Sequence, residues 1–156
     1  MSHSMKKYLA LLFVATSLTA TIKAQSARDY MDGQISRDVA SALERAKKTE
    51  KPVVIITYNP DNKERFSATN SANEHAFTGF FGLPETRKLL SENFIQIFAP
   101  WSAKGISTYL DPEDKTNLPV AIFLDQNGTI ITRLPCSGNP TDAMKKVQEL
   151  VKVVKG

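Results

Sequence analysis

Cys136 is the only cysteine among the 156 residues, and it is the only reactive nucleophile candidate in the sequence. Thiol–disulfide exchange needs one thiolate to attack and normally a second thiol to resolve the mixed disulfide. A single cysteine forms no internal disulfide and completes no zinc or haem cysteine pattern. Cys136 is therefore either a structural, buried thiol or a monothiol that pairs with another molecule.

His75 is the one histidine beyond the first residues of the chain, and Glu74 beside it is the only metal-binding neighbour. Zinc sites in proteins take three or four ligands, so this pair is too small for one. No Gly-x-Ser-x-Gly elbow accompanies the histidine, so a Ser–His triad has no support. We interpret His75 as a solvated or locally hydrogen-bonded side chain. The sequence predicts no cofactor and no metal.

The first residues have the layout of a secretory signal peptide. Lys6 and Lys7 precede an apolar run over 8–14 and a small-residue stretch over 15–24, and Met5 is the expected start. The apolar run is too short to span a bilayer, which takes about 20 residues. A retained amphipathic anchor is the alternative.

We expect cleavage after Ala24, with Ala20 as the second choice, then a lead-in over 25–37 and one domain over 38–156. No cysteine lies near either cleavage site, which argues against a lipid-anchored lipoprotein. Cleavage removes three lysines and lowers the net charge from +4 to +1. A near-neutral protein has no electrostatic basis for binding nucleic acid or an anionic membrane. The sequence predicts an exported protein, periplasmic or secreted, with no stable membrane anchor after cleavage.

The central element is a strand over 53–56, where four consecutive β-branched residues leave no polar face. Such a run is typical of a strand covered on both sides, as in the parallel part of an α/β sheet. The spacing of Val39, Leu43 and Ala46 predicts an amphipathic helix before it, with Ser36 as the N-cap.

The segment over 59–83 is the least patterned part of the chain. We expect Gly79 and Gly82 to bracket a turn around Phe80 and Phe81. A helix should begin at Pro84, since proline suits the first helical position. This helix is expected to place Leu89 and Leu90 inward and Arg87, Lys88 and Glu92 outward.

The second half of the domain should hold a strand over 94–99, a helical turn near 106–110 and a hairpin. The hairpin strands are predicted over 120–124 and 129–134, because Asn127-Gly128 between them is a strong hairpin signal. Asn127-Gly-Thr129 also matches the N-glycosylation sequon, but the hairpin turn already explains these residues. A final helix, capped by Asn139 or Thr141, is expected to align an apolar face comprising Met144, Val147, Val151 and Val154.

This order of elements resembles the thioredoxin-like fold, including secreted domains related to the C-terminal domain of the DsbD reductase. The resemblance covers roughly residues 38–154 and rests on three stretches: the helix-to-strand entry over 46–54, Leu118-Pro119-Val120 and the hairpin turn over 123–128. It implies a three-layer α/β/α sandwich whose mixed sheet combines a βαβ half and a ββα half.

The family's Cys-x-x-Cys motif is missing. The two cysteine positions of that motif would fall near Asn62 and Arg65 in this sequence, and neither residue is cysteine. The resemblance therefore does not carry dithiol oxidoreductase activity to this chain. It implies a cis bond before Pro119, which would leave the backbone of Leu118 able to pair with an extended peptide.

The favoured hypothesis is a protein- or peptide-binding, chaperone-like module in the cell envelope or outside the cell. Its binding surface would comprise Leu118, Pro119, the 59–65 loop and Trp101. The alternative is a monothiol redox protein that uses Cys136, which the hairpin pairing should place near Pro119. A purely structural partner in an export or surface complex is a third hypothesis. Four aromatic residues could form a docking patch, although we expect them in the core with Trp101 as the exception: Phe77, Phe80, Phe81 and Trp101.

Overall fold

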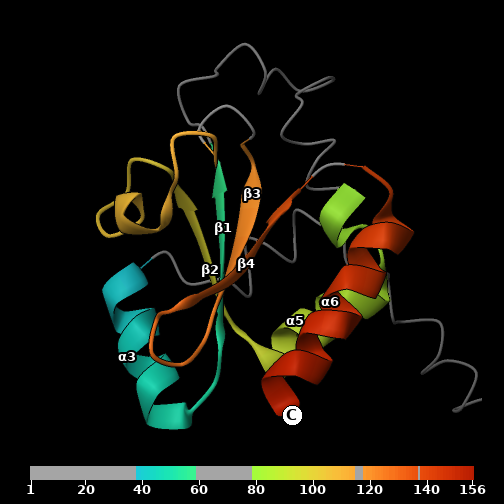
Figure 1. Ribbon diagram of the computed structural model, residues 1–156, viewed down its shortest axis with the longest axis horizontal. Coiled ribbons are helices and arrows are strands. Elements are labelled where there is room, and N and C mark those ends of the chain that lie inside the picture. Colours follow the sequence, from blue (N-terminus) through green and yellow to red (C-terminus); the bar gives the residue numbers. More distant parts are fainter. Residues whose placement is uncertain (1–37, 59–78, 115–117, 137) are drawn as a thin grey trace, which may run out of the picture.

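The computed structural model describes residues 38–58, 79–114, 118–136 and 138–156. The predicted signal peptide, the lead-in, the 59–65 loop and His75 lie outside the described residues. None of the described helices is long and apolar enough to cross a membrane. The elements in chain order are α3 (Val39–Thr49), β1 (Val53–Tyr58), α5 (Pro84–Asn93), β2 (Ile95–Pro100), the 3₁₀ helix η2 (Ser107–Tyr109), β3 (Val120–Leu124), β4 (Ile130–Pro135) and α6 (Pro140–Lys155) (Figure 1).

The four described strands form one mixed sheet in the order β2-β1-β3-β4. β1 runs parallel to β2 and antiparallel to β3, and β3 is antiparallel to β4. The run over 53–56 therefore lies in an inner strand, as predicted, and its four side chains have no exposed surface. Each such side chain contributes about 1.5–3 kcal/mol when fully buried.

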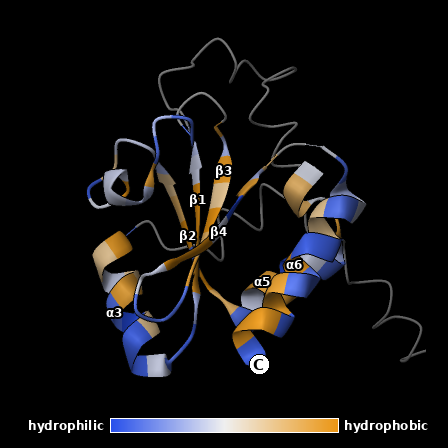
Figure 2. Ribbon diagram, in the orientation of Figure 1, coloured by the Kyte–Doolittle hydropathy of each residue, from blue (hydrophilic) through white to orange (hydrophobic). Residues whose placement is uncertain are grey.

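Helices cover both faces of the sheet, with α3 on one side and α5 and α6 on the other (Figure 1). Apolar residues concentrate on the strands and on the inner sides of the helices (Figure 2). Each face has its own core cluster, so the predicted three-layer α/β/α arrangement is confirmed. The α5/α6 face includes Phe80, Phe81, Leu90, Phe94, Phe123, Cys136, Val147 and Val151; the α3 face includes Val39, Ala42, Ala46, Ile55, Ile97, Ile106 and Ile122.

The N-cap of helix α3 is Asp38, two residues after the predicted Ser36. Oδ1 of Asp38 accepts a hydrogen bond from the amide of Ser41 at 3.2 Å. A carboxylate at this position satisfies an otherwise unpaired amide and complements the positive end of the helix dipole. The helix closes at Glu50, whose backbone is left-handed with φ 54°, and β1 follows directly.

The region before α5 departs from the prediction in two ways. Gly79, Phe80 and Phe81 are helical instead of forming a turn, and both phenylalanines are buried. Arg87 was expected outward, but only 8% of it is exposed, and its guanidinium donates to the carbonyls of Phe81 and Gly82. Carbonyls at the end of a helical turn need donors, and the long arginine side chain reaches back to supply them. Pro84 opens α5, as predicted.

The hairpin and the last helix follow the predicted pattern closely. Oδ1 of Asp125 accepts from the amides of Asn127 and Thr129 at 2.9 and 2.8 Å, and Gly128 has the positive φ of 85° that the turn requires. Asn139 caps α6 by accepting from the amide of Thr141. The buried face of α6 comprises Val147, Leu150 and Val151, whereas Met144 and Val154 are half-buried.

Candidate functional site

Several chain segments meet at the carboxyl end of β1. The amide of Trp101, just after β2, donates to the carbonyl of Tyr58 at 2.9 Å. Thr57 pairs with Val120, so Pro119 comes next to the end of β1. The amide of Cys136, just after β4, donates to the carbonyl of Pro119 at 3.0 Å. Of the predicted binding residues, this end of the sheet brings together Trp101, Leu118 and Pro119, whereas Asn62 and Arg65 lie outside the described residues.

The Leu118–Pro119 peptide bond is cis, as predicted. Pro119 is buried and Leu118 is half-buried. Within the described ranges, neither the amide nor the carbonyl of Leu118 makes a hydrogen bond. Such backbone groups at the end of a sheet are what an extended peptide uses when it pairs as an added strand.

Cys136 lies beside Pro119, as the hairpin pairing predicted, but its side chain has no exposed surface. It packs in the core of the α5/α6 face with Phe80, Phe81 and Phe123. Burial raises the pKa of the Cys136 thiol, because the thiolate would lose its hydration. Reactive cysteines have the opposite setting, with a lowered pKa and partial exposure. In this conformation the thiol is neutral and closed off from solvent.

The aromatic residues near this end of the sheet belong mainly to the core. Phe80 and Phe81 pack edge to face, with centroids 5.0 Å apart, and both are buried as expected. Phe77 lies outside the described residues. Tyr58 stacks on Phe98 at 4.7 Å, and both are half-buried. Trp101 is half-buried too, so it is less exposed than the predicted exception but keeps part of its surface in solvent.

A charged network around Arg133 on β4 was not predicted from the sequence. Arg133 forms ion pairs with Asp111 at 3.2 Å and with Asp114 at 3.0 Å, and its Nη2 donates to the carbonyl of Tyr109 at 3.1 Å. Oδ2 of Asp114 also accepts from the amide of Asp111 at 2.8 Å. The only signal in the sequence was an arginine within a mostly apolar hairpin strand. Its partners lie more than eighteen residues away, and nothing in the local pattern identifies them.

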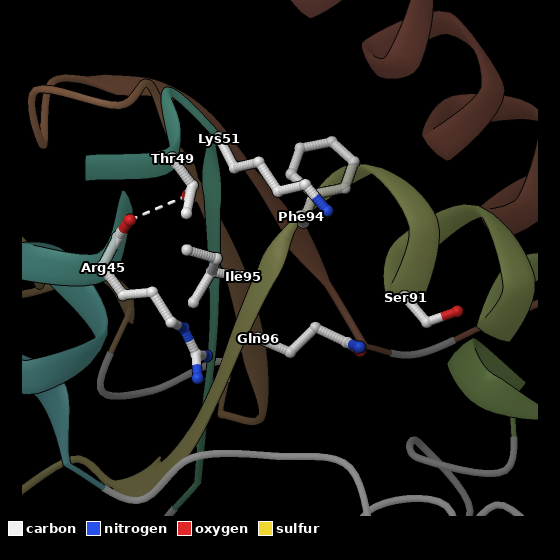
Figure 3. A pocket seen from close by; sticks show the side chains of 7 residues that line it. All are labelled: Arg45, Thr49, Lys51, Ser91, Phe94, Ile95 and Gln96. Atoms are coloured by element: carbon white, nitrogen blue, oxygen red, sulfur yellow. Dashed lines mark hydrogen bonds between the residues drawn. The ribbon is translucent and has the colours of Figure 1, made fainter. Parts of the chain in front are cut away.

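A groove of about 260 Å³ lies at the opposite end of the sheet, between α3 and α5. Figure 3 shows its lining, with Arg45 and Thr49 from α3 and Gln96 from β2. Lys51 extends past Phe94, and its Nζ lies 3.4 Å from the carbonyl of Glu92 near the end of α5. A cation there complements the negative end of the helix, so we interpret it as structural.

Metal chemistry finds no support in the described ranges of the chain. They hold no group of three or more His, Cys, Asp or Glu side chains close enough to bind an ion. Among the described residues, the groups at the carboxyl end of β1 include backbone amides and carbonyls, the indole of Trp101 and the buried thiol of Cys136.

Comparisons with known proteins identify the fold. The sequence matches no protein-family model, and no curated protein matches it. Among solved structures, a thioredoxin from Thermus thermophilus is similar with a TM-score of 0.58 and 13% identity, covering 75% of this chain and 87% of that one. A DsbH oxidoreductase is similar with a TM-score of 0.52 and 15% identity, covering 78% of this chain and 87% of that one. This chain therefore has a thioredoxin-like fold, and its sequence lacks the Cys-x-x-Cys motif.

Proposed function

We propose that this chain is an exported thioredoxin-fold protein that binds an extended protein segment and performs no dithiol chemistry. The binding surface is the carboxyl end of β1, with Leu118, Pro119 and Trp101 as its described members. Export is supported by the arrangement of Lys6, Lys7 and the apolar run over 8–14. The partner is a protein or peptide in the cell envelope or outside the cell.

The observation that carries this proposal is the state of the only cysteine. A dithiol enzyme needs two thiols, and the sequence has one. That one has no exposed surface, and burial raises its pKa. An attacking thiol must reach its target and must ionise near ambient pH, and Cys136 meets neither condition in this conformation.

Binding is supported by what surrounds Leu118. Its backbone groups make no hydrogen bond within the described part of the chain, so they can pair with an incoming strand. Trp101 is anchored by its own amide on Tyr58 and keeps part of its side chain exposed. A partly exposed tryptophan is the kind of group that often dominates binding energy in protein interfaces.

The alternative is a monothiol redox protein that uses Cys136. Its position beside Pro119 favours this hypothesis, because a mixed disulfide there would lie next to the bound segment. Its burial opposes it, since the packed residues around it would have to open first: Phe80, Phe81, Phe123 and Val147.

Two assays on the mature protein separate these functions. The first is reduction of insulin disulfides together with titration of Cys136 by a thiol reagent under native and denaturing conditions. We expect no turnover, and a thiol that reacts only after denaturation. Turnover that disappears in Cys136→Ser would overturn the proposal in favour of the monothiol alternative.

The second assay measures binding of a reduced and alkylated unfolded polypeptide, which has no thiol to exchange. We expect binding to weaken at least about tenfold in Trp101→Ala, because an aromatic anchor is lost. Val153→Ala is the control, since Val153 on α6 is 67% exposed and lies away from the proposed surface. Equal affinities for the wild type, Trp101→Ala and Val153→Ala would count against this binding surface.

A further inference from the structure

We propose that Arg133 is a positioning residue that fixes the segment leading into Leu118 and Pro119, and so sets the geometry of the peptide-binding backbone. The predicted effect of Arg133 on peptide binding rests on the proposed function. The positioning of the backbone by Arg133 does not, since it concerns only how one segment of the chain is held on the sheet.

Arg133 contacts this segment at three places. Nη1 lies 3.2 Å from Asp111, Nε lies 3.0 Å from Asp114, and Nη2 donates to the carbonyl of Tyr109 at 3.1 Å. Nη2 donates a hydrogen bond, whereas Nε makes none to the described residues and its contact with Asp114 is an ion pair. A guanidinium is a rigid planar group, so the three contacts from one side chain together define the orientation of the segment. A lysine offers a single point of charge and cannot reproduce them.

The burial of these groups separates this network from an ordinary surface ion pair. The side chain of Asp114 is 11% exposed and that of Arg133 is 28% exposed. Exposed ion pairs contribute little to stability, but removing one partner of a buried pair leaves the other charge uncompensated. The free carboxylate of Asp114 would then favour a rearrangement that brings it to water.

Apolar packing holds this segment only in part. Helix η2 contributes no buried residue. Ile106 is buried, and Asp114 is the only other buried residue described between it and Leu118. Tyr109 and Leu110 are only partly buried where they pack against the core of the α3 face, and Arg133 supplies the polar contacts that orient the segment over 107–114. Residues 115–117, which lie outside the described residues, join this segment to Leu118 in the chain, and we expect that loosening the segment loosens Leu118.

Pro119 is also held by β4, the strand that carries Arg133. Arg133 lies opposite Ile122 in the β3–β4 register, and three residues further along β4 the amide of Cys136 donates to the carbonyl of Pro119. β4 thus holds Pro119 directly through the backbone and the preceding segment through Arg133. This arrangement accounts for a charged residue among the half-buried positions of β4.

The test compares Arg133→Met, Arg133→Lys and the wild type in two measurements. The first is the ¹⁵N order parameter of the Leu118 amide. We expect it to fall from about 0.85, typical of a rigid backbone, to below about 0.6 in Arg133→Met. The second is affinity for the alkylated unfolded polypeptide, which should fall roughly three- to tenfold in Arg133→Met, with Arg133→Lys in between.

Two control variants separate the positioning effect of Arg133 from a general loss of stability and from a change in net charge. Val151→Ala truncates a buried residue of α6 and destabilises the fold without touching the segment; it should leave the order parameter of Leu118 unchanged. Lys88→Met removes one positive charge from the exposed side of α5 and should leave both measurements unchanged. If Arg133→Met does not fold, Asp111→Asn removes one contact from a side chain that is 62% exposed, and a smaller shift in the same direction is expected.

The two proposals fail in different ways. An unchanged order parameter and affinity in Arg133→Met, with a wild type that binds, would overturn the positioning role and leave the binding function standing. A wild type that binds no polypeptide, with a Leu118 amide that still loses order in Arg133→Met, would overturn the proposed function and support the positioning of the backbone by Arg133.

Discussion

The two faces of the sheet are closed in different ways. The face under α5 and α6 is aromatic and includes Phe80, Phe81, Phe94 and Phe123, with the thiol of Cys136 among them. The face under α3 is aliphatic, and beyond the helix it is covered by the segment over 101–114, which the ion pairs of Arg133 hold in place. Apolar packing seals the first face, whereas the second combines apolar packing with the charged network of Arg133.

This difference separates the chemistry of the two faces. A thiol on the aromatic face is kept neutral, because desolvation penalises its ionised form. A segment held by ion pairs can be moved at a smaller cost in apolar contacts than one held by packing. We therefore expect substitutions on the aromatic face to change stability first, and substitutions of the Arg133 network to change the geometry at Leu118 first.

The largest expected effect is on the aromatic face. Phe123 is fully buried in β3 and packs edge to face against Phe94 with centroids 5.2 Å apart. Phe123→Ala should lower the free energy of unfolding by about 3–5 kcal/mol, because it removes the ring and leaves a cavity. Denaturant titration followed by circular dichroism measures the loss.

The neighbouring residue is a matched control for the other face. Ile122 is equally buried but points toward α3, and Ile122→Val should cost only about 0.5–1.5 kcal/mol. A loss below about 1.5 kcal/mol in Phe123→Ala would show that the aromatic face tolerates cavities, and the contrast between the two faces would then be wrong.

A middle-sized effect is expected from Arg87, a buried cation on the face under α5 and α6. Arg87 is 8% exposed and donates to the carbonyls of Phe81 and Gly82. Arg87→Met keeps much of the apolar volume but removes both donors, so stability should fall by about 1–3 kcal/mol. The same denaturant titration gives the value.

Lys88→Met is the control next to it in sequence. The Lys88 side chain is 74% exposed, and its Nζ lies 3.9 Å from Glu92, so its loss should change stability by less than about 0.5 kcal/mol. Equal losses in the two variants would mean that Arg87 contributes through helix charge and not through the carbonyls it contacts.

The elements of the fold could be predicted from local pattern. The β-branched run over 53–56 leaves no polar face, Pro84 suits a first helical turn, and Asn127-Gly128 demands a hairpin turn. Each of these signals is contained in a few adjacent residues, and each was confirmed. The order of the elements then led to the fold, which the solved structures support.

The interactions that define the site could not be predicted in the same way. Arg87 looked like an exposed residue of an amphipathic helix, because the carbonyls that bury it belong to the preceding turn. Arg133 and Asp114 are nineteen residues apart, and they meet only because the β2–β3 connection crosses the sheet. The burial of Cys136 likewise depends on Phe80 and Phe81 packing from a distant segment. Charge pairs and burial arise from tertiary contacts, and local spacing does not specify their partners.

The smallest effect concerns Cys136 and depends on pH. Burial raises the pKa of its thiol in the folded state, whereas the pKa of the thiol in the unfolded chain is about 8.5. The folded protein therefore keeps its proton at pH values where the unfolded chain loses it. The contribution of Cys136 to the free energy of unfolding is therefore fully present below the pKa that the thiol has in the unfolded chain, and it is lost as the pH rises above that value. Between pH 8.5 and 9.5 the loss should be about 1 kcal/mol.

The comparison with Cys136→Ala isolates this contribution, because other groups titrate equally in both proteins. Urea titrations across this pH range, under reducing conditions, should show the wild type losing about 1 kcal/mol more than the variant. The constant cost of the truncation cancels, since only the change with pH is compared. Parallel curves would mean that the thiol ionises as easily in the folded protein as in the unfolded chain. The aromatic face would then admit solvent to Cys136, and the monothiol alternative would gain the accessible thiolate that it needs.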